Sequence, residues 1–190
     1  MGNDILEYTY PKGFFMTCIA VVRQDKTIYM AGDRGASTED SISRLKAPKV
    51  FKIGSYLFGY AGTMDGERIR HNFKPPILKS NMNLDKFMYT DFLISLRNFY
   101  ENWWVDITKD SDFGMLIAVK GRIFEHNAVD MSLTEYEDDY LAMGSGSDFA
   151  LGSLWTTQNQ KNGKRRAQLA VEAAVKYSTS CIGPVDVISI

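Results

Sequence analysis

Apolar residues with β-branched and aromatic side chains come in short runs through the first sixty residues, with polar breaks between them. Such runs are typical of buried strands, and the break after the first run is short enough for a hairpin. Gly54 and Ser55 break the second pair of runs in the same way. The predicted strands comprise residues 17–22, 27–31, 49–53 and 56–60. Thr17 therefore begins the first strand.

The spacing of apolar residues becomes helical in the next part of the chain. We expect helices at residues 63–73 and 84–104, separated by a Pro-Pro pair that neither helix can contain. The apolar residues of the second helix would share one face: Leu84, Phe87, Met88, Phe92 and Leu96. This part of the sequence therefore predicts a helix pair that follows a sheet.

Strands and then helices follow again in the second half. Lys120 and Gly121 predict a tight turn between two strands, and Ser147 can cap a helix. The expected strands are 113–119, 121–127, 140–143 and 185–190, and the expected helices are 147–155 and 165–177. Strands and helices that come in separate runs favour a layered α+β domain over a doubly wound parallel sheet, where they alternate singly.

Composition narrows the class of protein. The 190 residues, 45% of them hydrophobic, suffice for one core and include no linker that would divide two domains. The 22 basic and 23 acidic residues nearly cancel, so neither nucleic acid nor an anionic membrane surface is an expected partner. No apolar run approaches the roughly 20 residues that span a bilayer.

The N-terminus and the cysteines point to a cytoplasmic protein. Asp4 and Glu7 stand where a secretory signal would be basic, and no long apolar segment follows them. Without such a signal, Cys18 and Cys181 are better interpreted as reduced core residues than as a disulfide.

Four stretches of sequence carry the candidate chemistry: Thr17 at its strand start, Asp33 in AGDRGAST, Lys49 in LKAPKVFKIG and Ser145 in MGSGSDFALG. Together they resemble the threonine-protease family of proteasome β subunits and its bacterial relative HslV. Asp33 and Lys49 follow Thr17 by 16 and 32 residues, as their counterparts follow the nucleophilic Thr of that family. The stretches GYAGTMDG and AVEAAVKY...GPVDVISI extend the likeness over nearly everything after Thr17.

The resemblance implies a four-layer αββα sandwich of the N-terminal-nucleophile hydrolase type, and a role for each residue. Thr17 Oγ would attack a peptide carbonyl, with the α-amine of the same residue as general base. Lys49 would lower the pKa of that amine by like-charge repulsion, and Asp33 would hold Lys49 charged and oriented. The backbone N–H of Gly62, at a helix start, would stabilise the oxyanion. Ser145 would bond near the amine and relay protons.

Each of these residues also has an ordinary structural explanation. Thr is a common strand former, an Asp beside Gly commonly makes a turn, and a Lys at a strand start is commonly solvated. Ser145 between glycines would serve equally well as a helix entry. His71 and His126 stand alone, without metal-ligand spacing, so we expect no metal site and assign both to structural or surface positions. No cofactor is expected either.

Two departures from the family pattern concern the reactive amine. Proteasome β subunits place an Asp and, three residues later, a Ser before the last strand, whereas this chain has Ser178 and Cys181. Ser178 can bond toward Thr17 but supplies no carboxylate, and this turn has a purely structural interpretation as well. The family also places Gly before the Thr, because a residue without Cβ permits the strained turn of self-cleavage, and this chain has Met16.

Met16 leaves two interpretations open. Met16-Thr17 can be a translation start whose Met an aminopeptidase removes, with residues 1–16 as upstream sequence or a propeptide-like extension and residues 17–190 as the domain. If the extension is retained, Thr17 has no α-amine and the chain is inactive.

Two functions follow as hypotheses. The first is a threonine endopeptidase subunit of a ring assembly that cleaves unfolded polypeptides, which implies self-association and an ATP-dependent unfoldase. The second is a non-catalytic structural or assembly subunit with the same fold. The aromatic segment at residues 99–104 also admits a binding module, but aromatics at helical spacing belong more often to a core or a subunit interface.

Overall fold

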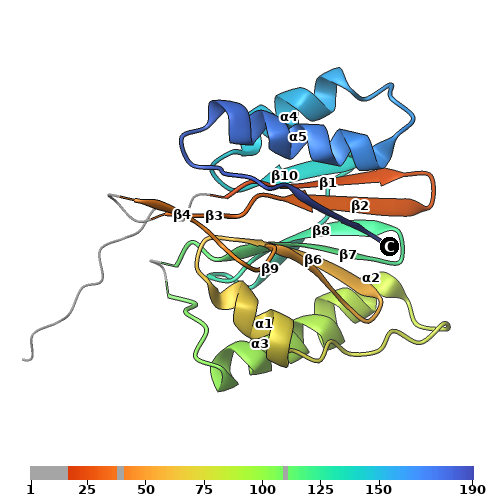
Figure 1. The fold of residues 1–190 in the computed structure, drawn as a ribbon. Helices are drawn as coiled ribbons and strands as arrows, with labels where there is room; N and C mark the ends of the chain where they lie inside the picture. Colours follow the sequence, from red (N-terminus) through yellow and green to blue (C-terminus); the bar gives the residue numbers. More distant parts are fainter. Residues whose placement is uncertain (1–16, 38–40, 109–110) are drawn as a thin grey trace, which may run out of the picture.

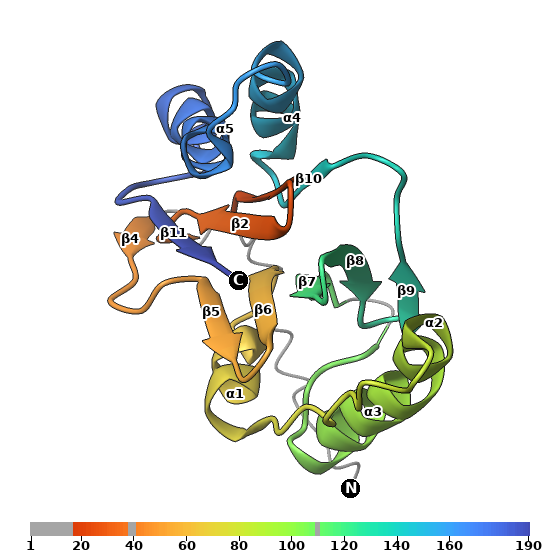
Figure 2. The ribbon, with the colours of Figure 1, turned by 90° about the vertical axis from the view of Figure 1, so that its right-hand side faces the viewer.

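The computed structural model of the protein describes residues 17–37, 41–108 and 111–190. The extension expected at residues 1–16 lies outside them. Figure 1 shows the layers: helices α4 and α5 cover one sheet, a second sheet lies beneath it, and α1 and α3 lie on the far side of the second sheet. Figure 2, turned by 90°, shows the two sheets one above the other, with the C-terminal strand β11 in the upper one.

The first sheet is antiparallel and has four strands, in the order β10 (Tyr140–Met143), β1 (Ile19–Gln24), β2 (Thr27–Gly32) and β11 (Asp186–Ser189). Gln24 pairs with Thr27, and Asp25 between them has a positive φ of 55°. The polar break therefore forms a two-residue hairpin turn, as the pattern predicted.

The second sheet is antiparallel and has five strands, in the order β5 (Val50–Ile53), β6 (Tyr56–Ala61), β7 (Gly114–Val119), β8 (Arg122–Asn127) and β9 (Ser132–Thr134). Lys120 and Gly121 connect β7 to β8 with positive φ angles, which confirms the predicted tight turn. A short hairpin of β3 (Gly35–Ser37) and β4 (Ile42–Arg44) stands apart from both sheets.

The helices follow the predicted order. They are α1 (Asp65–Asn72), α2 (Leu84–Phe87), the π-helical η1 (Met88–Phe92), α3 (Leu93–Asn102), α4 (Ser147–Thr156) and α5 (Gly163–Tyr177). The single helix expected at 84–104 is thus one continuous segment whose middle turn is π-helical. Among the described residues, none of these helices has the length and apolar character needed to cross a membrane.

Three hydrophobic clusters lie between the layers. Two of them follow from the alternation of side chains along β1 and the residue before it. Cys18, Ala20 and Val22 join a cluster of mostly small side chains with α4 and α5. Ile19 and Val21 point the other way, into a cluster of residues from both sheets. Because side chains alternate along a strand, one apolar run serves both faces. A third cluster, rich in aromatic rings, fills the space between the second sheet and α1 to α3.

Candidate active site

Thr17 lies two residues before β1, which begins at Ile19 rather than at Thr17 as predicted, and Thr17 is only 2% exposed. Its carbonyl oxygen accepts a hydrogen bond of 3.1 Å from the backbone N–H of Gly146, in the loop between β10 and α4. Gly144 in that loop has a φ of +95°, and a Cβ there would lie 2.3 Å from the Thr17 oxygen. Only glycine permits this close approach, so the GSG stretch holds the backbone of Thr17 in place.

Lys49 and Asp33 meet beside the Thr17 hydroxyl. Asp33 directly follows β2 of the first sheet, and Lys49 directly precedes β5 of the second. The Lys49 Nζ atom lies 2.7 Å from Thr17 Oγ1 and 2.9 Å from Asp33 Oδ1. Asp33 is fully buried and Lys49 is 2% exposed. The structure therefore brings together three residues that the sequence spacing singled out.

The Asp33 carboxylate has several other donors around it. The backbone N–H groups of Cys18 and Ile182 donate to it at 3.0 and 3.3 Å, and that of Gly35 donates at 2.7 Å. Backbone N–H groups stabilise an ionised carboxylate in a buried site, because they replace the water that it has lost. These bonds fix both oxygens of Asp33, and Asp33 in turn fixes Lys49.

The protonation of Lys49 reflects two opposed influences. Burial lowers the pKa of the Lys49 ammonium, and the ion pair with Asp33 acts against that shift. A desolvated ammonium 2.7 Å from a threonine hydroxyl stabilises negative charge that develops on the oxygen. The same positive charge disfavours protonation of a nearby amine.

A row of serine hydroxyls lies on the other side of Thr17. The Thr17 nitrogen donates to Ser145 Oγ at 3.2 Å, and Ser145 Oγ donates to Ser180 Oγ at 3.1 Å. Ser180 Oγ also contacts Ser178 Oγ, and the Ser180 backbone N–H donates to Ser178 Oγ at 3.2 Å. Ser145 is thus where the resemblance implied, whereas Ser180 stands between it and Ser178.

Ser180 was not among the site residues predicted from the sequence. The Ser-Thr-Ser stretch that follows α5 was a visible signal, but only the fold shows which of its hydroxyls faces Ser145. Ser180 is 5% exposed, whereas Thr179 is exposed.

Cys18 and Cys181 are buried and free, as expected of reduced core residues. Burial raises the pKa of the Cys18 thiol, and it raises that of Cys181 to about 11 against the opposing hydrogen bonds of Ser178 and Ser180. Neither group is therefore a thiolate at neutral pH, which is the form needed for nucleophilic attack. Cys181 contributes a neutral thiol to the serine row.

Gly62 lies in the loop between β6 and α1, three residues before the helix begins. The expectation that it stands at a helix start was therefore wrong by about one turn. Its φ is +87°, and a Cβ there would lie 2.3 Å from the carbonyl oxygen of Asp112. This position therefore requires glycine, as a loop that presents its backbone to a ligand often does.

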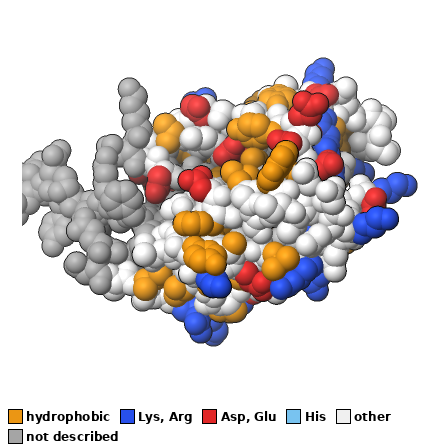
Figure 3. All heavy atoms as spheres, turned by 90° about the horizontal axis from the view of Figure 1, so that it is seen from above, with side chains coloured by type: hydrophobic (Ala, Val, Ile, Leu, Met, Phe, Trp, Pro, Cys, Tyr) orange, Lys and Arg blue, Asp and Glu red, His pale blue; other side chains and the backbone are white. Residues whose placement is uncertain are grey.

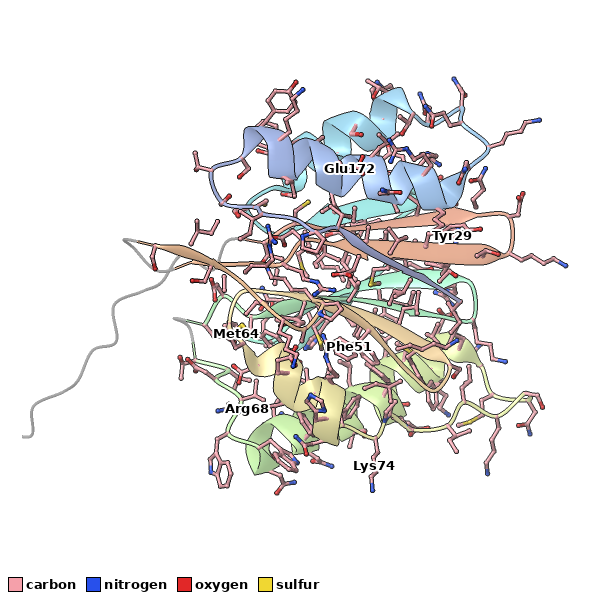
Figure 4. All side chains as sticks on the ribbon, viewed as in Figure 1. Tyr29, Phe51, Met64, Arg68, Lys74 and Glu172 are labelled. Carbon is pink, nitrogen blue, oxygen red and sulfur yellow. The ribbon has the colours of Figure 1, made fainter. Side chains whose placement is uncertain are left out.

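A pocket opens beside Thr17. Its lining includes Thr17, Lys49 and Gly62, together with four residues that sequence analysis did not select: Gly35, Ala36, Tyr60 and Met64. Met64, which Figure 4 labels above α1, is 37% exposed and borders the pocket on the solvent side. The lining therefore combines the threonine hydroxyl and the Lys49 ammonium with mostly uncharged groups.

The two histidines lie in different environments. His71 is largely exposed and lies 3.7 Å from Glu67 on α1. His126 is fully buried on β8, and its Nδ1 atom is 2.8 Å from the Ser132 carbonyl oxygen. Burial lowers the pKa of His126 to about 4.

Comparison with known proteins gives a curated relative and solved structures with a similar fold. No protein-family model matches the chain. The ATP-dependent protease subunit HslV of Treponema denticola is 28% identical over 156 residues, which cover 77% of this chain and 79% of that protein. BPH of Thiobacillus denitrificans, solved in complex with epoxomicin, superposes with a TM-score of 0.76 at 20% identity and covers 92% of this chain and 98% of its own. HslV from Trypanosoma brucei follows, with a TM-score of 0.68, 18% identity and coverage of 91% and 98%.

These likenesses confirm the resemblance to the proteasome β-subunit and HslV family. The solved structures have an α+β fold of this type over more than nine tenths of the chain. The relative from Treponema denticola is described as an ATP-dependent protease subunit.

Proposed function

We propose that this protein is a threonine endopeptidase subunit that works once Thr17 is its N-terminal residue. The observation that carries the proposal is the position of Lys49 Nζ, 2.7 Å from Thr17 Oγ1 and 2.9 Å from Asp33, in a buried cluster. Burying a lysine ammonium beside a threonine hydroxyl costs free energy, because the ammonium loses its hydration. A lysine with no role at this site would therefore be expected at the surface. The arrangement instead suits a nucleophile beside a fixed positive charge.

The proposed reaction needs no histidine. The α-amine of Thr17 removes the proton of Thr17 Oγ as the oxygen attacks the peptide carbonyl, and the Gly62 backbone N–H stabilises the oxyanion. The amine then gives that proton to the leaving nitrogen of the substrate. An ester between Thr17 Oγ and the substrate remains, and water hydrolyses it with the amine again as base. Lys49 keeps the amine neutral and stabilises charge on Oγ, while Asp33 holds Lys49.

Release of the amine is the condition for this chemistry. Met16 precedes Thr17 in the sequence, and with that peptide bond intact the Thr17 nitrogen is an amide without basic character. We propose that residues 1–16 are not part of the working enzyme, that residues 17–190 form its domain, and that removal of Met16 by an aminopeptidase exposes Thr17.

The proposed setting is a cytoplasmic ring assembly. We propose that the fold is a four-layer αββα sandwich of the N-terminal-nucleophile type, which the helices on either side of the two sheets in Figure 1 support. The relative from Treponema denticola is described as a subunit of an ATP-dependent protease. We infer that copies of this chain associate into rings, that unfolded polypeptides are the substrates, and that an ATP-dependent unfoldase supplies them.

The surface near α3 supports self-association. Large apolar side chains are exposed along η1, α3 and the residues that follow: Tyr89, Ile94, Trp103 and Trp104. We expect Ile94→Asp, at a site 60% exposed, to shift sedimentation toward smaller species, whereas Ile77→Asp, at an even more exposed site outside these helices, should not. A wild-type chain that stays monomeric at every concentration would contradict the ring.

A second function is favoured by three departures from the family pattern. The peptide bond to Met16 and the neutral groups at Ser178 and Cys181 suit a subunit that keeps the fold and the ring contacts without catalysis. Such a structural or assembly subunit would retain its extension in the mature protein.

The intact mass of the purified protein and its peptidase activity separate the two functions. A chain that begins at Thr17 and hydrolyses a fluorogenic peptide, with activity lost in Thr17→Ala, supports the enzyme. A stable chain that begins at Met1 or Gly2 supports the assembly subunit, as does a chain prepared to begin at Thr17 that cleaves nothing.

A further inference from the structure

We propose that Ser180 is a positioning residue that orients the Ser145 hydroxyl and thereby keeps the lone pair of the Thr17 amine available for catalysis. This inference rests on the proposed function, since it concerns the same reactive amine. The Ser-Thr-Ser stretch after α5 is thereby given a role in the site.

The geometry forms a row of directed hydrogen bonds. The Thr17 nitrogen donates to Ser145 Oγ at 3.2 Å, and Ser145 Oγ donates to Ser180 Oγ at 3.1 Å. Ser180 is 5% exposed and contacts the hydroxyl of Ser178. Ser145 and Ser180 are 35 residues apart in the sequence, so the contact depends on the packing of the α5 end against the start of α4.

Ser180 determines the direction in which the Ser145 hydroxyl proton points. A serine hydroxyl has one proton to donate and two lone pairs to accept with. When Ser145 gives its proton to Ser180, it presents only lone pairs to the Thr17 nitrogen. It then accepts an N–H of the amine and leaves the nitrogen lone pair free to take the proton of Thr17 Oγ.

Without Ser180 the Ser145 hydroxyl loses its acceptor and can turn its proton toward the amine. The amine lone pair would then be engaged by a hydrogen bond that must break before proton abstraction. Such a bond also stabilises the neutral amine, so it would lower the pKa of the amine while slowing the reaction. A smaller kcat together with a lower amine pKa is therefore the specific signature of losing Ser180.

The loop that carries Ser180 is fixed at two points. The Ser180 backbone N–H donates to Ser178 Oγ at 3.2 Å, and that of Ile182 donates to Asp33 Oδ2 at 3.3 Å. Two residues of one loop therefore serve the two sides of Thr17. Substitution of the Ser180 hydroxyl alone leaves the bond from Ile182 to Asp33 in place, which separates the two roles.

The size of the effect follows from the exposure of Ser145. Because Ser145 is exposed, a water molecule can accept the hydrogen bond of the Ser145 hydroxyl in some of the molecules when Ser180 is absent. One net hydrogen bond is worth about 1 kcal/mol, so we expect a loss of about 3- to 10-fold rather than the full effect of losing a general base.

The experiment uses the chain that begins at Thr17, in the variants Ser180→Ala and Ser180→Thr, with Thr179→Ala as the control that removes a neighbouring exposed hydroxyl. Ser180→Ala should reduce kcat about 3- to 10-fold with KM unchanged and move the acid limb of the pH profile to lower pH by about 0.5. Ser180→Thr should restore most of the activity, and Thr179→Ala should match the wild type.

A titration by NMR makes the result independent of turnover. The methyl signal of Thr17 in threonine-labelled protein reports the pKa of the adjacent amine, which should fall in Ser180→Ala and not in Thr179→Ala. Unchanged kcat and amine pKa in Ser180→Ala would overturn the inference. So would a loss of activity that shows no pH shift and that Ser180→Thr does not restore. If the parent chain cleaves no peptide but its amine pKa still falls in Ser180→Ala, the hydroxyl row stands and the proposed function fails.

Discussion

The two sides of Thr17 are built differently. On one side a buried ion pair of Lys49 and Asp33 is fixed by backbone N–H groups, and on the other side neutral hydroxyls of Ser145, Ser180 and Ser178 form a row. The ion pair has fixed charges with fixed partners. The hydroxyls have protons that rotate, so the direction of each bond depends on its neighbour.

This difference separates two kinds of contribution to one site. A buried charge near the nucleophile acts over several ångströms, and its removal leaves a partner uncompensated, so large effects are expected. A neutral hydroxyl acts through one bond that water can partly replace, so small effects are expected. Variants on the two sides should therefore differ in size and in the property that they change.

The outer face of α4 and α5 is a third region for the comparison. Figure 3 shows hydrophobic side chains there among charged ones. The large apolar residues that are exposed on these helices are Phe149, Trp155 and Tyr177, and Phe149 stacks on Tyr177 with ring centroids 6.3 Å apart. Trp155→Ala, at a site 62% exposed, serves as a control for the whole comparison, because Trp155 lies at the opposite end of α4 from Ser145.

The largest effect is expected from Lys49. Lys49→Ala on the chain that begins at Thr17 should lower peptidase kcat by about 10²–10⁴-fold, because the amine would be protonated more often and Oγ would lose its nearest positive charge. Lys49→Arg should lose nearly as much, since the planar guanidinium does not fit a point contact with one hydroxyl. Steady-state kinetics measure both.

The control for Lys49 is Lys52→Ala, which removes an exposed lysine of β5. It should leave kcat unchanged and alter stability by under about 0.5 kcal/mol. Asp33 keeps its three backbone donors in Lys49→Ala, so the variant should fold. Full activity in both Lys49 variants would remove Lys49 from the mechanism.

Asp33 should affect stability as well as rate. Asp33→Asn places an amide, itself a donor, among groups that all donate: Lys49 Nζ and the N–H groups of Cys18, Gly35 and Ile182. We expect a loss of about 3–5 kcal/mol in the free energy of unfolding, measured by chemical denaturation, because a buried charge loses its counter-charge.

The partly exposed pair of Asp186 and Arg34 is the matched control for Asp33. It has two bonds of 2.6 and 2.7 Å, but each side chain is about a fifth exposed. Asp186→Asn should therefore lose about 1 kcal/mol or less. Equal losses of unfolding free energy in Asp33→Asn and Asp186→Asn would contradict the claim that burial makes the Asp33 ion pair more important for stability.

His126 extends the comparison to a buried ring that bonds a backbone carbonyl instead of a carboxylate. Its pKa in the folded protein is about 4, below the roughly 6.5 of an unfolded chain. Its contribution to stability is therefore complete above pH 6.5 and is lost as the pH falls toward 4. We expect the wild type to lose about 2 kcal/mol more stability than His126→Phe between pH 7 and pH 5. Denaturation curves at both pH values with parallel losses would contradict this.

The smallest effect is expected from Ser178, at the far end of the hydroxyl row. Ser178→Ala leaves Ser145 bonded to Ser180, so kcat should fall by about 2-fold or less and the pH profile should stay in place. A larger loss than in Ser180→Ala would mean that Ser178 acts on Thr17 directly and that the order of the row is wrong.

Much of the fold followed from the sequence because long elements have strong periodicity. Apart from β9, the strands of both sheets fall within two residues of the predicted bounds, and so do the helices α4 and α5. The hairpin of β3 and β4 and the strand β9 were missed, because three-residue strands are too short to show a period, and β4 is exposed throughout. The π-helical turn has no signal in the apolar pattern, since it keeps Met88 and Phe92 on the buried face.

The residues of the ion pair beside Thr17 were predicted from the sequence, whereas Ser180 in the hydroxyl row was not. Asp33 and Lys49 were found through their separations from Thr17, which the resemblance made meaningful. Ser180 and the pocket residues Ala36 and Tyr60 were missed, because their positions depend on contacts between segments far apart in the sequence. Periodicity describes how one element packs but does not indicate which loop hydroxyl will face another.

The central claim is that Thr17 provides both the nucleophile and the base. An epoxyketone such as epoxomicin has two electrophilic carbons, which a hydroxyl and an amine of the same residue can attack together. Intact mass spectrometry of the Thr17-initiated chain after incubation with epoxomicin should show one adduct per chain, located on Thr17 by fragmentation, and no adduct on the chain that begins at Met1. Absence of an adduct on the Thr17-initiated chain, or an equal adduct on both chains, would contradict the claim.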